Sequence, residues 1–240
     1  MKNLITSTLL LLALLLPATA TAYDFEVDGI YYNINGNEVT VTYKGNYESD
    51  YQNDYSGNVI IPATVTYNGT TYSVTSIGYG AFYGCSGLIG VEIPNSVTSI
   101  GIMAFSRCTG LRSVTIGNSV TSIGDEAFCR CSALTSVTIP NSVTSIGTLA
   151  FYGCTRLRRV TIPNSVTYIG REAFDDTEWF DNQPDGLVYA GLVAYKYKGR
   201  MPEGTHIIIT DGTKGIAGGA FSDCSGLTSV TIPNSVTTKS

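Results

Sequence analysis

The chain has 240 residues, of which 43% are hydrophobic and 14% are charged, and its formal net charge is −5 at pH 7. A chain of this length and composition can bury a sizeable hydrophobic core. The acidic balance argues against nucleic acid and against an anionic lipid surface as partners, although ordinary solubility is enough to explain it.

Residues 1–22 are interpreted as an export signal. Lys2 provides a positive start, residues 9–16 are apolar, and residues 20–22 are small, as a cleavage site requires. The apolar stretch is too short to span a bilayer well, and no second stretch of this kind follows. We therefore expect an exported protein, located at the cell surface or outside the cell, with a mature chain that begins at Tyr23.

Residues 23–57 do not share the pattern of the later sequence and are predicted to form an N-terminal β cap. Two alternating segments, 30–34 and 39–43, flank Asn35-Gly36, which is a strong signal for a β-hairpin. A solenoid needs such a cap over the apolar end of its first coil. The segment is rich in tyrosine, which half-buried cap residues explain better than a carbohydrate-stacking surface does.

From residue 58 to residue 240 the sequence repeats with a period of 23 residues, which indicates a solenoid. Each coil contains a Val-x-Ile strand, a turn with Pro and Asn, a second extended piece that ends at Gly, and a return segment. We expect a short helical or 3₁₀ turn in the return segment. Stacked coils would bury equivalent side chains on one another, as in the series Ile100, Ile123, Ile146, Ile169 and the series Phe105, Phe128, Phe151, Phe174.

Two interruptions of the repeat are expected to be hairpins. One lies around Asn68-Gly69 within the first coil, and the other lies around Ala190-Gly191 in an irregular coil at residues 175–205. Phe180 falls one period after Leu157 and is predicted to fill the same position in the core. The register then returns, and the last repeat stops in mid-pattern, as a truncated product would.

The pattern L-x-x-V-x-I-x-x-S at residues 111–119 resembles a leucine-rich repeat. The longer pattern I-P-N-S-V-T-S-I-G-x-x-A-F-x-x-C-x-x-L at residues 139–157 resembles the BspA-type (treponemal-type) leucine-rich repeat, and this resemblance covers about residues 59–240. It implies a β-rich, right-handed superhelical solenoid with a parallel sheet on its concave side. It also implies exported bacterial surface proteins, some of which bind host matrix proteins, and it brings no catalytic residues.

The cysteines are interpreted as a structural ladder. Five of the six occupy one repeat position and are expected to be buried and reduced, because side chains stacked in parallel point the same way and not at each other. These are Cys85, Cys108, Cys131, Cys154 and Cys224. Cys129 lies off the ladder and is expected to be the accessible thiol.

No cofactor, metal site or enzymatic activity is predicted. Cys129, Cys131 and the single His206 do not supply the four placed ligands that zinc needs. The acidic residues after Phe174 match no calcium loop. No motif gives His206 a nucleophilic partner, and no inward pair of carboxylates for glycoside hydrolysis is indicated.

The residues that flank the inward Val of each strand are predicted to line the concave sheet. Departures from a Ser/Thr background mark a ligand-binding surface there, although exposed threonine is also explained by strand propensity alone. The candidate residues are Glu92, Thr115, Thr138, Arg159, Thr161, His206, Ile208 and Thr231. Glu92 and Arg159 would lie about 14 Å apart at strand spacing.

The leading hypothesis is a non-enzymatic, exported recognition protein that adheres to a host or neighbouring-cell protein through its solenoid surface. One alternative is a passive structural spacer or surface-layer module. The other is a glycan-binding or glycan-cleaving β-solenoid. The sequence identifies neither the ligand nor the means of anchoring.

Overall fold

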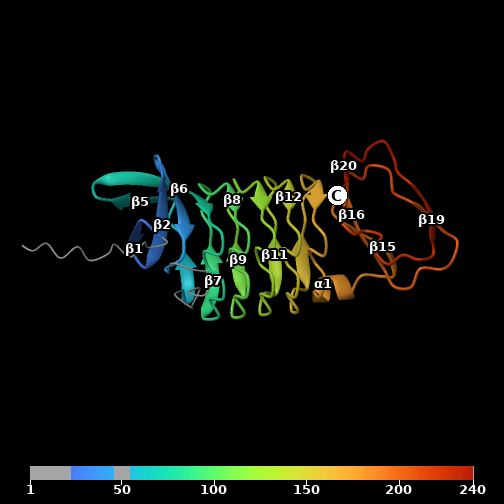
Figure 1. Ribbon diagram of the computed structural model, residues 1–240, viewed down its shortest axis with the longest axis horizontal. Coiled ribbons are helices and arrows are strands. Elements are labelled where there is room, and N and C mark those ends of the chain that lie inside the picture. The colour runs from blue at the N-terminus through green and yellow to red at the C-terminus, as the bar shows by residue number, and fades with distance from the viewer. Residues whose placement is uncertain (1–22, 46–54, 240) are drawn as a thin grey trace, which may run out of the picture.

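The computed structural model describes residues 23–45 and 55–239, so the predicted export signal lies outside the described residues. Within them the chain forms a β-solenoid whose coils lie side by side along the long axis of the molecule (Figure 1). Equivalent residues of successive coils pair directly, as Ile123 does with Ile146, 23 positions later. The predicted fold class, a solenoid of 23-residue coils, is therefore confirmed.

The N-terminal cap is an antiparallel arrangement of three strands that continues into the solenoid. Its strands are β1 (Phe25–Val27), β2 (Ile30–Asn35) and β3 (Glu38–Thr42). The predicted hairpin around Asn35-Gly36 is present, because β2 and β3 pair across this turn. β3 then pairs in parallel with the first strand of the coil sheet, so the cap covers that end of the core.

The longest sheet runs along one side of the solenoid and is built from short strands. The predicted hairpin at Asn68-Gly69 joins β5 (Thr64–Tyr67) to β6 (Thr70–Ile77), and β6 begins the parallel series. The series continues through the two-residue strands β8 (Ser99–Ile100), β10 (Ser122–Ile123), β12 (Ser145–Ile146) and β14 (Tyr168–Ile169).

The Val-x-Ile strands form a second series on another side of the solenoid, and this series is divided into three sheets. Their members are β4 (Gly57–Ile60), β7 (Leu88–Glu92) and β9 (Ser113–Thr115); β11 (Ser136–Thr138) and β13 (Arg159–Thr161); and β17 (Thr205–Ile208) and β19 (Leu227–Thr231). The resemblance implied one parallel sheet here, whereas the continuous sheet is the series of short strands.

The division between β9 and β11 coincides with the one regular coil that has Gly in place of Pro after the strand. A Cβ atom at Gly117 would lie 2.3 Å from the carbonyl oxygen of Pro94, so only glycine allows this close approach to the preceding coil.

The return segments are series of tight turns, and the expected helical or 3₁₀ turn is wrong for them. Two residues in each return segment have positive φ, as Met103 at 56° and Arg107 at 61° do, which a right-handed helix excludes. Alternate amides also bond to the next coil: the N–H of Phe105 donates to the carbonyl of Ala127 at 2.7 Å. The intervening amides keep local bonds, as the N–H of Ser106 does to the carbonyl of Met103 at 3.0 Å, so single turns alternate with bonds to the next coil and no helix forms.

The core consists of stacked copies of the same side chains. Ring centroids of successive phenylalanines, from Phe82 to Phe174, lie 4.7–5.4 Å apart with interplanar angles of 4–11°. Each inner ladder thiol donates to the carbonyl of the Phe in the preceding coil, for example Cys131 to Phe105 at 3.1 Å. Burial raises the pKa of Cys131 well above its usual value, so this thiol stays protonated.

The expectations for two cysteines require correction. Cys129 was expected to be accessible, but only 6% of its surface is exposed, and burial raises its pKa to about 11. The equivalent residues of the neighbouring coils are Ser106 and Tyr152, and the spacing of the repeat alone does not show that the thiol between them is covered. Cys224 is on the ladder but is only partly buried, because a neighbouring coil covers the return segment of the last described coil on one side only.

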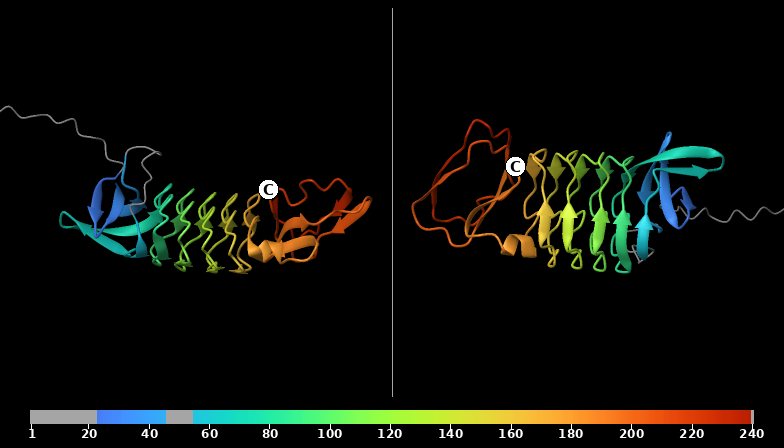
Figure 2. Two further views of the ribbon diagram at one scale, coloured as in Figure 1. Left: turned by 90° about the horizontal axis from the view of Figure 1, so that it is seen from below. Right: turned by 180° about the vertical axis from the view of Figure 1, so that it is seen from behind.

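After β14 the chain enters the irregular coil, which lies at the start of a wider C-terminal region (Figure 2). It contains the short helix α1 (Glu178–Asp181) and the predicted hairpin of β15 (Gly186–Ala190) and β16 (Val193–Lys198). β16 is followed in its sheet by β18 (Gly215–Ile216) and β20 (Thr238–Lys239). Phe180 packs against the core but remains half-buried, so it does not fill the Leu157 position as completely as predicted.

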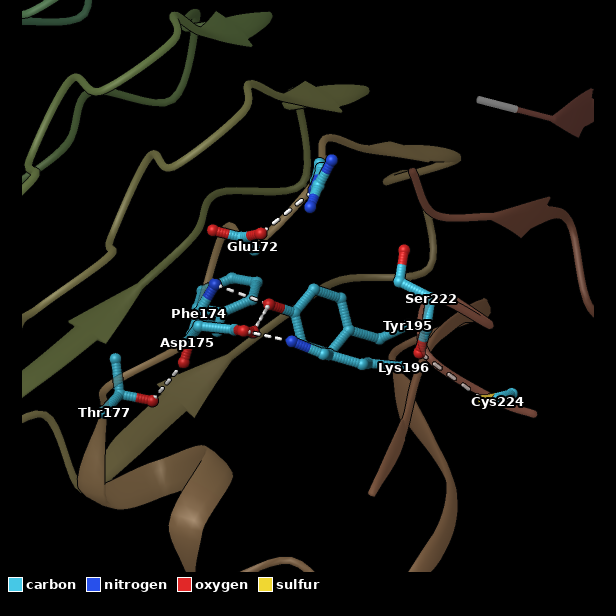
Figure 3. Close-up of polar contacts among 9 residues, drawn as sticks. Glu172, Phe174, Asp175, Thr177, Tyr195, Lys196, Ser222 and Cys224 are labelled. Atoms are coloured by element: carbon cyan, nitrogen blue, oxygen red, sulfur yellow. Dashed lines mark hydrogen bonds and ion pairs between the residues drawn. The ribbon is translucent and has the colours of Figure 1, made fainter. Parts of the chain in front are cut away.

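Side chains complete the hydrogen bonding where the regular coils end. The N–H of Phe174 donates to the buried hydroxyl of Tyr195 at 2.8 Å, where earlier phenylalanines use a backbone carbonyl (Figure 3). The same hydroxyl donates to Asp175 at 2.7 Å, and Asp175 also pairs with Lys196. Thr177, one period after Cys154, donates its hydroxyl to the carbonyl of Phe174 at 2.6 Å.

Candidate functional site

The candidate site is the outward strand face, defined as the solvent-facing side of β4, β7, β9, β11, β13, β17 and β19. In each strand the inward residue packs on the core, and the two residues that flank it point outward. Direct pairing aligns the outward residues in rows across neighbouring strands. Glu92 pairs with Thr115, Thr138 pairs with Thr161, and Ile208 pairs with Thr231.

The structure places all eight candidate residues on this face, and all of them are exposed. It does not bring them into one cluster. Glu92 and Thr115 belong to the first outward sheet, Thr138, Arg159 and Thr161 to the second, and the other three to the third. The irregular coil separates the second sheet from the third, so a partner that touches all three must be elongated.

Two isoleucines are the most exposed apolar residues on the face. Ile208 is 69% exposed and Ile60 is 67% exposed, whereas no isoleucine of the core is more than 8% exposed. The sequence did not lead us to Ile60, although Ile60 directly follows the inward Val59 of its strand and could have been identified from that position. Ile60 pairs with Glu92 and so belongs to the same outward row. A partner that covers these side chains would gain from burying their apolar surface.

His206 is held on the face by hydroxyl groups of the next coil. Its Nδ1 atom contacts the hydroxyl of Ser229, and its Nε2 atom lies 3.2 Å from the hydroxyl of Thr231. Both ring nitrogens are therefore used in fixing the ring against β19. No motif in the sequence indicated the contact with Ser229, and the second ring nitrogen faces a hydroxyl and not the carboxylate that orients the histidine of a Ser-His-Asp triad.

A shallow groove crosses the face where β9 and β11 are not paired. Its volume is about 350 Å³, and it is lined by hydroxyl groups of Thr115, Ser136 and Thr138 and by the apolar surfaces of Val114 and Pro140. Such a groove can accept a side chain of a partner.

Ionisable groups in residues 23–45 and 55–239 are dispersed or already paired. In this part of the chain no three His, Cys, Asp or Glu side chains gather as a metal ion would require. Asp175 receives bonds from Tyr195 and Lys196, and burial followed by the charge of Asp175 raises the pKa of Tyr195 well above its usual value. This group is thus a packed structural junction. No helix in the described residues has the length and apolarity to cross a membrane.

The sequence pattern described as the BspA type leucine rich repeat region matches residues 58–180 and 195–240, in six copies. Among solved structures, a leucine rich repeat protein from T. pallidum is 25% identical with a TM-score of 0.59, and the match covers 90% of this chain and 85% of that chain. A leucine-rich repeat protein from Bacteroides capillosus is 32% identical with a TM-score of 0.50, covering 57% of this chain and 96% of that chain. A comparison with curated proteins finds no match.

Proposed function

This chain belongs to the BspA-type leucine-rich repeat family, and on that premise we propose that it is an exported, non-enzymatic recognition protein. It acts at the cell surface or outside the cell and adheres to a protein of a host or neighbouring cell. The partner is elongated and lies along the outward strand face. The observation that carries this proposal is the exposure of Ile60 and Ile208 on a face whose other positions are mostly Ser and Thr.

The charge of the middle coils indicates which partner surface suits this face. Residues 100–171 contain seven arginines and two acidic residues, a net charge of +5, although Arg158 pairs with Glu178 and Arg171 pairs with Glu172. Arg159 lies on the face itself, and Arg112 precedes β9 by one residue. A partner with an acidic segment over β13 and apolar side chains over Ile208 would complement this distribution.

The alternatives predict different surfaces. A passive spacer has no use for isoleucines that remain about two-thirds exposed, as Ile60 and Ile208 do. A glycan-cleaving enzyme would need two carboxylates facing one another across a groove, and the groove between β9 and β11 is lined by hydroxyl and apolar groups instead. Recognition of a protein uses both the apolar and the charged departures on the face.

The proposal is tested by adhesion of the purified chain to an immobilised mixture of extracellular-matrix proteins. The variant Arg159→Glu with Ile208→Ser should lose at least tenfold in apparent affinity and keep the parental melting temperature, because both side chains are exposed. The matched control is Arg130→Glu with Ile102→Ser, which makes the same chemical changes at exposed positions of the return segments. Loss of adhesion in the control and not in the test variant would place the binding surface on the turns.

The control avoids Asp125, which lies on the same turns. The carboxylate of Asp125 accepts a hydrogen bond from the backbone N–H of Thr148 at 2.7 Å, so replacing it would disturb the coil above.

A further inference from the structure

One backbone edge of β4, the first strand of the outward strand face, is unpaired within residues 23–45 and 55–239. β4 pairs only with β7 among the described strands. The N–H groups of Gly57 and Ile61 donate to β7 and its neighbouring residues at 2.9 and 3.0 Å. Because amides alternate in direction along a strand, those of Asn58 and Ile60 point away from β7. Neither amide has a hydrogen-bond partner in the part of the chain that the structure describes.

A cavity of about 500 Å³ lies beside this edge, between β4, the turn that joins β1 to β2, and β5. Its walls include the apolar side chains of Val27, Ile60, Pro62 and Val65. Its size falls within the range of about 300–1,000 Å³ that is typical of ligand sites. The tyrosines that line it, Tyr32 and Tyr55, are buried, so the cavity offers no exposed aromatic face for stacking a sugar.

Tyr32 lies in the wall of the cavity, but its hydroxyl is closed off from the cavity. The side chain is fully buried, and its hydroxyl has no hydrogen-bond partner among the described residues. Tyr55 shows the contrast: its hydroxyl donates to the carbonyl of Thr42 at 2.9 Å and accepts from the N–H of Tyr31 at 3.1 Å. Buried polar groups are normally paired, so the unpaired hydroxyl of Tyr32 lowers stability and offers no contact to a ligand.

Asp28 gives the cavity its charge. It is exposed in the turn between β1 and β2, at a φ of 52°, and it forms no ion pair with a described residue. No other residue lining the cavity is charged. Residues 23–45 contain four acidic residues and one lysine, a net charge of −3, and residues 55–91 contain no charged residue. Burial, and then the charge of Asp28, raises the pKa of Tyr32 well above its usual value, which places the carboxylate within electrostatic reach of this hydroxyl.

We propose that the cavity and the free edge of β4 form a docking site for an extended peptide segment of a partner protein. The segment adds a strand to β4 through the amides of Asn58 and Ile60 and places a Lys or Arg side chain against Asp28. Addition of a strand to an open sheet edge supplies main-chain hydrogen bonds, and the cavity supplies side-chain selectivity. This site shares Ile60 with the outward strand face, but Asp28 and the free amides of β4 play no part in the proposed function, so the peptide titration can fail or succeed separately from adhesion.

The probe is an acetylated and amidated hexapeptide of alternating Thr and Val with one central Lys, labelled for fluorescence anisotropy and titrated with the full chain. The matched probe has Glu in place of Lys. The Lys peptide should bind at least tenfold more tightly than the Glu peptide. Asp28→Asn should remove this difference, since Asn tolerates the same positive φ and lacks the charge. Equal binding of the two peptides to the parent chain would overturn the proposal.

Two further variants separate the edge from the cavity. Ile60→Pro removes a free amide that β7 does not use, and it should weaken the Lys peptide at least fivefold relative to Ile60→Ala, which removes the side chain only. Tyr32→Phe should keep or raise the melting temperature, because an unpaired buried hydroxyl is lost, and should leave the affinity for the Lys peptide within twofold. Equal affinity of Ile60→Pro and Ile60→Ala for the Lys peptide would overturn strand addition at this site.

The remaining occupant to consider is a second copy of this chain, whose arginine-rich coils could also approach Asp28. Analytical ultracentrifugation of the parent and of Asp28→Asn, without peptide, distinguishes this case. The proposal predicts the same molecular mass for both. A dimer of the parent that dissociates in Asp28→Asn would assign the site to self-association and overturn the peptide assignment.

Discussion

The regular coils and the irregular coil solve the same hydrogen-bonding problem in different ways. In the regular coils every second amide of a return segment donates to a backbone carbonyl of the next coil, as Phe128 does to Ala150. At the end of the regular series the N–H of Phe174 has no such carbonyl in the next coil and donates to the hydroxyl of Tyr195 instead. The repeat can therefore be interrupted where a buried side chain replaces the missing backbone group.

The difference also shows how the outward strand face is organised. Stacking continues the core through the interruption, since Phe174 contacts Trp179 and Tyr195 at centroid distances of 5.2 and 5.7 Å. The outward strand face does not continue, because the strands of the irregular coil, β15 and β16, belong to another sheet and do not join β13 to β17. The core is thus continuous while the face is divided into three sheets, which favours an elongated partner over a compact one.

The largest expected effect comes from breaking the regular stack. Ile123→Asp would bury a carboxylate between two coils, and we expect a loss of more than about 4 kcal/mol and unfolding of several neighbouring coils. The matched control is Ile102→Asp. Ile123 is only 1% exposed, whereas Ile102 is 46% exposed, so Ile102→Asp should change stability by less than about 0.5 kcal/mol. Thermal unfolding followed by circular dichroism measures both, and similar melting temperatures for the two variants would contradict the assigned register.

The junction is tested by Tyr195→Phe. This change leaves the buried N–H of Phe174 without an acceptor, and we expect a loss of roughly 1–3 kcal/mol. Hydrogen exchange should show faster exchange of the Phe174 amide than of the Phe151 amide, which keeps its partner in Ala173. Tyr197→Phe is the control, because its hydroxyl has no hydrogen bond within the described residues. An unchanged exchange rate at Phe174 would show that this hydroxyl is dispensable.

A smaller effect is expected from the thiols of the regular coils at alkaline pH. Burial raises the pKa of Cys129 to about 11, while the thiol of an unfolded chain has a pKa of about 8.5. Above pH 8.5 the unfolded chain binds fewer protons than the folded chain, so stability falls as pH rises toward 11. Between pH 7 and pH 10.5 the contribution of Cys129 to this loss is roughly 2.5 kcal/mol. Melting temperatures between pH 7 and pH 10.5 should fall less steeply for Cys129→Ser than for the parent, and parallel curves would contradict the burial of this thiol.

The smallest effect is expected for another exposed row of threonines, which recurs every 23 residues at Thr98, Thr121 and Thr144. The hydroxyl of Thr121 donates to the carbonyl of Thr98 at 3.1 Å on the solvent side of the solenoid. Water can replace this bond, so Thr121→Ala should lower the free energy of unfolding by less than about 0.5 kcal/mol. Chemical denaturation measures the difference, and a loss above 1 kcal/mol would mean that exposed polar rows contribute to stacking as much as buried ones do.

The period of the sequence was sufficient to predict the solenoid and its stacked rows, and turn residues were sufficient to predict its three hairpins. Equivalent positions such as Phe128 and Phe151 must lie above one another once the period is constant, and Asn-Gly or Ala-Gly pairs mark where the chain reverses. The candidate residues Glu92, Arg159 and Ile208 could be placed on the exposed side of strands, because side-chain direction alternates along a strand.

Features that depend on contacts between unlike segments could not be predicted. The positive φ angles of the return segments depend on amides bonding to the next coil, which no local preference of Met103 or Glu126 reveals. The burial of Cys129 depends on the neighbouring coils, and the role of Tyr195 depends on how a hairpin folds back onto Phe174. The cavity beside β4 is formed by segments from both the cap and the first coil, so neither pattern alone indicates it.

The most direct test of the proposed recognition surface is hydroxyl-radical footprinting of the unmodified chain, free and bound to the immobilised matrix proteins. The oxidation rates of Ile60, Ile208 and Ile102 are compared by mass spectrometry, since all three are exposed in the free chain. Binding along the outward strand face predicts at least threefold slower oxidation of Ile208 and Ile60, with Ile102 unchanged. Protection of Ile102 without protection of Ile208 would contradict that account and assign recognition to the return segments.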